Sequence, residues 1–150
     1  MQDAIEGELA VELCLRSAAP SVARGRQERV RDRVAELESR GVVADATVTY
    51  WNTRVCIPGS NAGPADRCPR VVGEILDAVE DGDVSIEPYF RRREASHDAD
   101  ECVLALPVIC LLVREEGELC GVYPATEDGE GHTVSDGLDR LETGEGVQNL

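Results

Sequence analysis

The basic residues that could bind an anionic ligand are all arginines: the chain has 15 of them and no lysine. A short stretch from Arg24 to Arg33 holds a cluster of them, with Glu28 and Asp32 as its only acidic residues: Arg24, Arg26, Arg29, Arg31 and Arg33. Such a cluster is typical of a phosphate-binding face, and it makes these arginines candidate nucleic-acid contacts. The alternative is a solvated helix face with i,i+3 ion pairs such as Glu28 with Arg31. The run Arg91–Arg93 is open to the same two interpretations.

The cysteines could bind a metal or act as thiols. The six, Cys14, Cys56, Cys68, Cys102, Cys110 and Cys120, form no C-x-x-C pair and no short Cys/His spacing of a zinc site. Cys102 and Cys110 lie in an apolar run and are expected in the core. Cys56 and Cys68 flank a loop and could meet in space, so a thiol- or metal-binding protein stays as an alternative. No metal site and no cofactor is expected.

The titratable residues show no catalytic pattern. His97 and His132 have no serine or cysteine partner at a recognisable spacing. The acidic runs 98–101 and 127–130 lack the alternation of a calcium loop, and no phosphate-cradling glycine motif is present. We therefore expect a protein that is not an enzyme, with no catalytic residue.

The neighbouring aromatic residues Tyr50 and Trp51 face opposite ways if they lie in a strand. Tyr50 falls with Val48 and is expected in the core, whereas Trp51 falls with threonines on the second face of the sheet. The same alternation in other strands brings four residues to that second face: Arg16, Trp51, Tyr89 and Arg91. Because Trp, Tyr and Arg are favoured interface anchors, this is a candidate partner or dimer face. We expect the final helix or a second copy of the chain to cover it.

These residues are positioned by elements that the hydrophobic pattern predicts. Strict alternation predicts a strand at 9–16, and i,i+3,i+4 spacing predicts helices at about 21–40, from 69 to about 81, and a short one at 134–141. Further strands are expected at 46–51, 54–57 and 84–90. The run 102–113 is apolar on both faces and predicts a central strand covered on both sides, followed by a hairpin into 119–123.

This order predicts an α/β (α+β) two-layer sandwich. We expect a mixed sheet of about five strands, with the two longer helices on one face and a short C-terminal helix, in a ferredoxin-like or related fold. The chain is expected to be a single domain over 1–150, with a core at about 9–142 and a frayed acidic tail at 143–150.

The composition is strongly acidic: 30 Asp and Glu give a net charge of −15, although 42% of the residues are hydrophobic. Dense carboxylates without lysine are typical of a halophilic archaeon, where molar salt screens self-repulsion. Such salt also weakens binding to phosphate, which favours the solvated-face interpretation of the arginines.

Residues 1–20 lack the pattern of a signal peptide, and the longest uncharged apolar run, 102–113, is too short to span a bilayer. We expect a cytoplasmic protein without membrane contact.

Several stretches, in this order, resemble a family of small haloarchaeal proteins that are commonly labelled helix-turn-helix domain proteins. They are VELCLRSAAP (11–20), RQERVRDRVAELESRG (26–41), VTYWNTRV (48–55), EPYFRRRE (87–94), LALPVICLLV (104–113), GELCGVYP (117–124) and HTVSDGLDRLE (132–142). The resemblance implies DNA binding and a transcriptional role. No recognition helix is carried over, because a strand separates the first helix from the next, whereas a helix-turn-helix joins two helices by a short turn.

The sequence thus favours a non-enzymatic regulatory or interaction module that self-associates or binds another protein. The alternatives are a DNA-binding transcriptional regulator and a thiol- or metal-binding protein.

Overall fold

The computed structural model describes residues 9–52, 54–58, 70–80, 84–86, 89–94, 101–144 and 147–150, with the backbone alone at 54–58, 91–94 and 101–103. Its elements are β1 (Leu9–Arg16), α1 (Ser21–Ser39), β2 (Asp45–Trp51), β3 (Arg54–Pro58), α2 (Arg70–Glu80), β4 (Val84–Ser85), β5 (Arg91–Glu94), β6 (Glu101–Ala105), β7 (Ile109–Glu115), β8 (Glu118–Tyr123), β9 (Ala125–Glu127), β10 (Glu130–His132) and α3 (Val134–Thr143).

The first three elements form a β–α–β unit whose two strands are parallel neighbours. Pro20, in an extended conformation, precedes the first turn of α1, and Gly41 follows the helix with a left-handed φ of 79°. The register places Leu13 beside Val48 and Cys14 beside Thr49. The predicted strand 9–16 and the helix that follows it are therefore confirmed.

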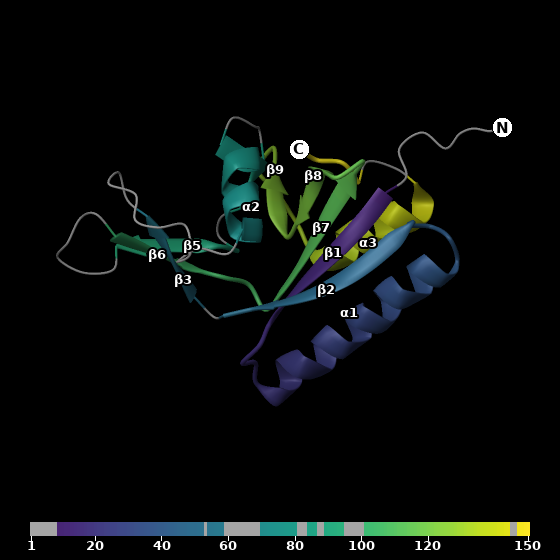
Figure 1. Cartoon of the computed structure of the whole chain (residues 1–150), viewed down its shortest axis with the longest axis horizontal. Helices are drawn as coiled ribbons and strands as arrows, with labels where there is room; N and C mark the ends of the chain where they lie inside the picture. Colours follow the sequence, from purple (N-terminus) through teal and green to yellow (C-terminus); the bar gives the residue numbers. More distant parts are fainter. Residues whose placement is uncertain are drawn as a thin grey trace.

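The central sheet has four strands in the order β2-β1-β7-β8, and all neighbours except β1 and β2 are antiparallel (Figure 1). Leu13 of β1 lies opposite Leu111 of β7. The expectation of one strand through 102–113 is wrong, because the run is divided into β6 and β7 around Pro107, which has no N–H to donate to a ladder. Its second half behaves as predicted, since residues 110–113 are fully buried from both faces.

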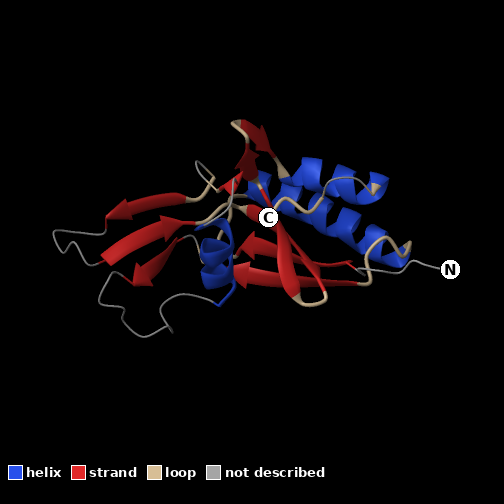
Figure 2. Cartoon of the chain, turned by 90° about the horizontal axis from the view of Figure 1, so that it is seen from above, coloured by secondary structure: helices blue, strands red, loops and turns tan. Residues whose placement is uncertain are grey.

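Two hydrophobic clusters lie on the two faces of this sheet. One joins α1 and α3 to the face of Leu13 and Leu111. The other joins α2 to the opposite face, which carries Cys14 and Leu112. Figure 2 shows α1 and α3 side by side along the strands. The expectation that the two longer helices share a face is therefore wrong: α1 shares its face with the short C-terminal helix, and α2 covers the other.

The remaining strands form two separate three-stranded sheets, β3-β6-β5 and β10-β9-β4. The first lies beyond one end of the central sheet (Figure 1). The structure is thus a mixed α/β fold, but it is not the expected ferredoxin-like plait, because β3 and β4 do not join the sheet of β1 and β2. The predicted strand 84–90 is reduced to Val84–Ser85, and residues 89–90 form a turn before β5.

The end of the chain is packed against β8, contrary to the expected frayed tail. Val147 is buried, and its carbonyl accepts a hydrogen bond from the Tyr123 hydroxyl at 2.8 Å. The amide of Asn149 accepts from the N–H of Val122 and donates to its C=O, both at 3.0 Å. The Leu150 N–H donates to the Cys120 carbonyl at 3.1 Å. The tail therefore provides hydrogen-bond partners for the backbone of Cys120 and Val122 at the outer edge of β8.

We expect Gly137→Ala to destabilise the protein, although alanine normally stabilises a helix interior relative to glycine. A Cβ at Gly137 would lie 2.7 Å from the ring of Tyr123, which is fully buried and held by its hydroxyl. Overpacking of this kind costs about 1–3 kcal/mol. Gly73→Ala, in α2, is the matched control, because its Cβ would meet nothing within 4 Å, and it should stabilise by about 0.5–1 kcal/mol. Free energies of unfolding from urea titrations test both, and shifts of the same sign would contradict this packing.

Candidate interaction surface

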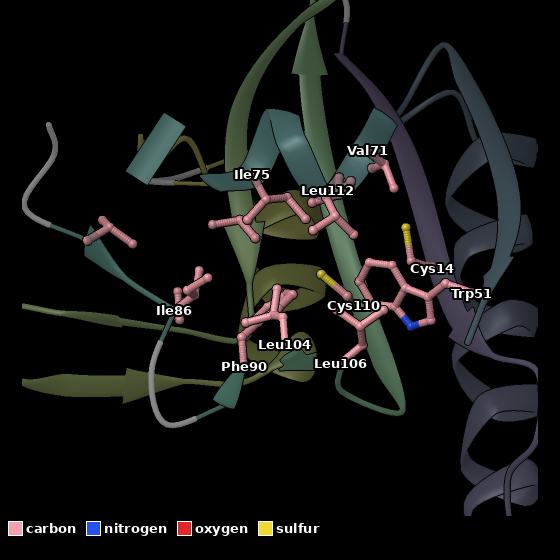
Figure 3. Close-up of a cluster of buried hydrophobic side chains, with 14 residues drawn as sticks. Cys14, Trp51, Val71, Ile75, Ile86, Phe90, Leu104, Leu106, Cys110 and Leu112 are labelled. Atoms are coloured by element: carbon pink, nitrogen blue, oxygen red, sulfur yellow. The ribbon is translucent and has the colours of Figure 1, made fainter. Parts of the chain in front are cut away.

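Trp51, the residue on which the predicted partner face depends, is buried within the chain. Only 4% of it is exposed, and its ring meets Phe90 edge to face with centroids 6.0 Å apart. Figure 3 shows it among Cys14, Cys110 and Leu106. Among the described residues, this face is covered by α2 together with Ile86, Phe90, Leu104 and Leu106, and not by the final helix. Trp51 is therefore unavailable to a partner, and the hypothesis of association through this face is wrong.

The other residues predicted for that face are also engaged or fall outside the description. The guanidinium of Arg16 donates to the Leu106 carbonyl, and Tyr89 packs against the buried cluster. For Arg91 the structure describes the backbone alone, in β5. Alternation correctly placed Arg16 and Trp51 on one face, since they are register partners. Both side chains, however, form hydrogen bonds within the chain.

Trp51 and Arg16 hold a short connection between β6 and β7, together with a residue that sequence patterns did not single out. The indole N–H of Trp51 donates to the Pro107 carbonyl at 3.1 Å. The Gln27 amide donates to the carbonyls of Val108 at 3.0 Å and of Arg16 at 3.1 Å. Gln27 is the one buried polar side chain among the described residues. These donors satisfy the carbonyls that the break at Pro107 removes from a ladder.

Tyr50, expected in the core, is instead exposed. It is 54% accessible and Val48 is 42% accessible, although both lie on the face that α1 covers elsewhere. The reason is that β2 is the outermost strand of the sheet, so α1 covers the face only in part there. The Tyr50 hydroxyl accepts a hydrogen bond of 3.4 Å from Arg31. Alternation places a residue on a face, but it does not tell whether that part of the face is covered.

The outer border of β2, which we call the β2 edge, has no partner strand in the described part of the chain. The Trp51 carbonyl faces β1, since it accepts from the N–H of Ser17 at 2.8 Å. Because successive residues of a strand point their N–H and C=O groups to alternate sides, those of Ala46, Val48 and Tyr50 face outward. Residues 46–51 carry no charge and no proline, so the common protections of an edge strand are missing.

The arginines of α1 do not form one cluster, because a helix advances 100° per residue and distributes them to two flanks. Arg33 lies on the flank toward α3 and pairs with Asp139 and Glu142, each at 2.6 Å. Arg31 lies on the other flank and contacts Tyr50. It does not contact Glu28, its expected ion-pair partner on a solvated helix face. By the same geometry Arg24 shares the flank of Arg31. Hydrogen bonds to the carboxylates of Asp139 and Glu142 raise the pKa of Arg33 above its usual value.

Arg26 and Arg29 lie on the α3 side of the helix, and both are exposed. Among the described residues, no carboxylate forms an ion pair with Arg24, Arg26 or Arg29. Of the five candidate nucleic-acid contacts, these three are therefore available to a ligand, whereas Arg33 is committed to α3.

A charged groove of about 530 Å³ lies between α2 and the sheet, and sequence patterns did not predict it. Arg114 binds both carboxylate oxygens of Glu74, at 2.7 and 2.9 Å, and reaches Glu12 at 3.1 Å. Glu12 also accepts from the Thr49 hydroxyl at 2.7 Å. The pKa of Glu74 is lowered first by the hydrogen bond from Arg114, against the opposing effect of burial. With these groups already paired, the network fastens α2 to the sheet and leaves little to hold a ligand.

Two of the described cysteines, Cys14 and Cys110, are not suited to thiol chemistry. Cys14 and Cys110 are register partners on β1 and β7, both are free, and both are fully buried. Burial raises the pKa of Cys14 to about 12 and that of Cys110 well above its usual value, so the thiolate is disfavoured. The side chains of Cys56, Cys68 and Cys102 lie outside the description. In its described part the chain has no group of three His, Cys, Asp or Glu side chains that could hold a metal.

His132 lies against Arg140 of α3, with ring nitrogens 3.3 and 3.4 Å from its guanidinium. Arg140 also donates to the Tyr123 hydroxyl at 2.8 Å and to Glu127 at 3.0 Å, and it stacks 5.5 Å from the Tyr123 ring centre. Burial raises the pKa of Tyr123. The cluster fastens α3 and the chain end to β8.

The fold and this surface define a small mixed α/β protein whose central sheet is covered on both faces and, within the described residues, has no partner strand beside β2. The chain matches the family model described as helix-turn-helix domain over residues 3–146, and it belongs to this family. The predicted family resemblance is thereby confirmed.

No curated protein and no solved structure matches the chain. Within the described residues, no helix is long and apolar enough to cross a membrane.

The geometry departs from the family description. In the described part of the chain, α1 ends at Ser39 and α2 begins at Arg70, with β2 and β3 between them, and α3 begins only at Val134. No two of these helices are joined by the turn of about 3–4 residues that a helix-turn-helix requires. The family membership therefore does not identify a recognition helix here.

We expect Glu74→Gln to lower stability at pH 7 and to have less effect in acid. Because the pKa of Glu74 is lowered in the folded state, its ion pair stabilises the protein above the unfolded pKa of about 4.3. This contribution is lost as the pH falls through the lower folded pKa, so the two unfolding midpoints should converge below about pH 4. Urea unfolding across this pH range measures the difference. Asp77→Asn, exposed on the same helix, is the control, and an effect of Glu74→Gln that does not depend on pH would contradict the prediction.

Proposed function

We propose that this member of the helix-turn-helix domain family is a non-enzymatic regulatory module that acts by binding another protein chain along the β2 edge. The observation that carries the proposal is the difference between the two edges of the sheet. The β8 edge is occupied by Asn149 and Leu150 of the same chain, whereas the β2 edge directs outward backbone groups that have no partner among the described residues.

The side chains at the β2 edge support the same function. Val48 and Tyr50 are two of the four large hydrophobic residues that are exposed among the described side chains. Strand addition to an exposed sheet edge is a common mode of protein recognition, in which main-chain hydrogen bonds give affinity and alternate side chains give specificity. An exposed strand with apolar side chains and outward N–H and C=O groups is what such a partner needs.

A photo-cross-linking amino acid at position 50 should capture a protein in the native cell, because this side chain is exposed beside the edge. The adduct should disappear when Val48→Asp is added, since a carboxylate there opposes strand pairing. The same cross-linker at Val22, which is 82% exposed on the other flank of α1, is the matched control. Adducts are read by mass spectrometry. The absence of an adduct specific to position 50, or one that survives Val48→Asp, would overturn the proposal.

Binding to nucleic acid is the second candidate function. The observation that favours it is a set of exposed arginines on α1 that have no carboxylate partner among the described residues, in a chain of this family. Arg26 and Arg29 lie together on one flank and could contact successive phosphates. The net charge of −15 opposes such binding, so the interaction would depend on local charge alone.

If the chain binds DNA in this way, Arg26→Ala with Arg29→Ala should weaken binding and reduce the salt dependence. Loss of about two phosphate contacts lowers the slope of log K against log salt by about 2. Fluorescence anisotropy with a DNA duplex, from low to molar KCl, measures both quantities. The matched control is Arg24→Ala with Arg31→Ala, on the opposite flank. An equal loss in both double variants would mean that net charge alone is responsible, and no binding by the wild type at any salt would exclude this candidate.

A further inference from the structure

We propose that the occupant of the β2 edge is a second copy of this chain, whose β2 pairs antiparallel with the first across a twofold axis at Val48. This inference rests on the proposed function and names its partner. The product would be one continuous sheet that runs through both copies, β8-β7-β1-β2 joined to the same order reversed.

The backbone of β2 is self-complementary in this arrangement. Ala46, Val48 and Tyr50 direct their N–H and C=O groups outward, as the Ser17–Trp51 hydrogen bond indicates. A twofold axis at Val48 sets Val48 opposite Val48 of the second copy, and Ala46 opposite Tyr50. Residues that face each other in this way exchange both N–H···O bonds, so the pairing supplies about six hydrogen bonds. Each outward group of these three residues would then find a partner.

The exposed apolar side chains become cross-strand pairs in the same register. Directly opposite residues share a face, with Cβ atoms about 4.5–5.5 Å apart. The two Val48 side chains, each 42% exposed in the single chain, would therefore contact each other at the axis. Tyr50 would lie beside Ala46 of the other copy. The exposed surface that distinguishes this edge is thus covered by the same surface of a second molecule.

The flank of α1 beside β2 adds charge complementarity. Arg31 marks this flank by its contact with Tyr50. Arg24 and Glu38 lie seven residues before and after it, within about 20° of the same line along the helix. All three are exposed. A twofold axis near Arg31 reverses the direction of the second α1, so Arg24 of each copy faces Glu38 of the other.

Salt should strengthen this association. Each copy carries a net charge of −15, and the two Arg31 side chains approach each other at the axis, so long-range repulsion opposes pairing. At about 1 M salt the Debye length is about 3 Å, which screens this repulsion and leaves the hydrogen bonds and apolar contacts. This dependence is opposite in sign to that of DNA binding.

Sedimentation velocity of the full chain, over about a hundredfold range of concentration and from about 0.1 to 2 M KCl, tests the proposal. We expect a monomer–dimer equilibrium that tightens with salt. Val48→Asp should weaken it at least about tenfold, because two carboxylates would face each other at the axis. Val22→Asp makes the same change at another exposed valine and should leave the equilibrium unchanged. A wild-type monomer throughout, or equal effects of the two variants, would overturn the proposal.

A charge exchange tests the twofold arrangement itself. Arg24→Glu and Glu38→Arg should each weaken the dimer by about threefold to tenfold, and the double variant should restore it. Failure of the double variant to restore association would contradict the antiparallel placement of the helices. If the chain is monomeric but the cross-linker at position 50 captures a different protein, the proposed function stands and the second copy as partner is excluded.

Discussion

Three consecutive carbonyls, at residues 106–108, hold the two halves of the fold together through the side chains that donate to them. Pro107 divides a long apolar run into two strands, and the carbonyls around it must find donors away from water. Arg16, Trp51 and Gln27 supply them from the end of β1, the end of β2 and the first half of α1. Their convergence fixes the β–α–β unit against β7. It also explains why an aromatic residue and an arginine that look like interface anchors are part of the interior.

Because β7 is buried on both faces, each face of the central sheet needs its own cover. The chain provides α1 and α3 for one face and α2 for the other, and the network of Arg114 with Glu12 and Glu74 fastens α2 in place. With both faces closed, the borders of the sheet are the parts left for recognition. The chain's own end closes the border at β8. The β2 edge differs in that Val48 and Tyr50 beside it are exposed.

Charge has different roles on the two sides of α1. Toward α3, Arg33 and Arg40 meet Glu142, and the hydrogen bonds from these two arginines lower the pKa of that carboxyl group. Toward β2, Arg24 and Arg31 have no carboxylate partner among the described residues. A cluster that looks uniform in sequence therefore divides between two flanks: Arg33 joins α1 to α3, while Arg31 contacts β2. The helical repeat alone produces this division, since 100° per residue separates neighbours in sequence.

Local patterns in the sequence were sufficient to predict β1, α1 and the resemblance to the family. Alternation at 9–16 and helical spacing at about 21–40 predicted β1 and α1, because a half-buried strand and an amphipathic helix need those periods. It also determined that Arg16 and Trp51 share a face. The packing of distant segments sets what covers that face, and it reverses the expected places of Tyr50 and Trp51. Trp51 is buried against Phe90, and Tyr50 is exposed because β2 is the outermost strand of the sheet. Periodicity reports which side a residue faces, but burial depends on which distant segment packs there, and no local pattern contains that information.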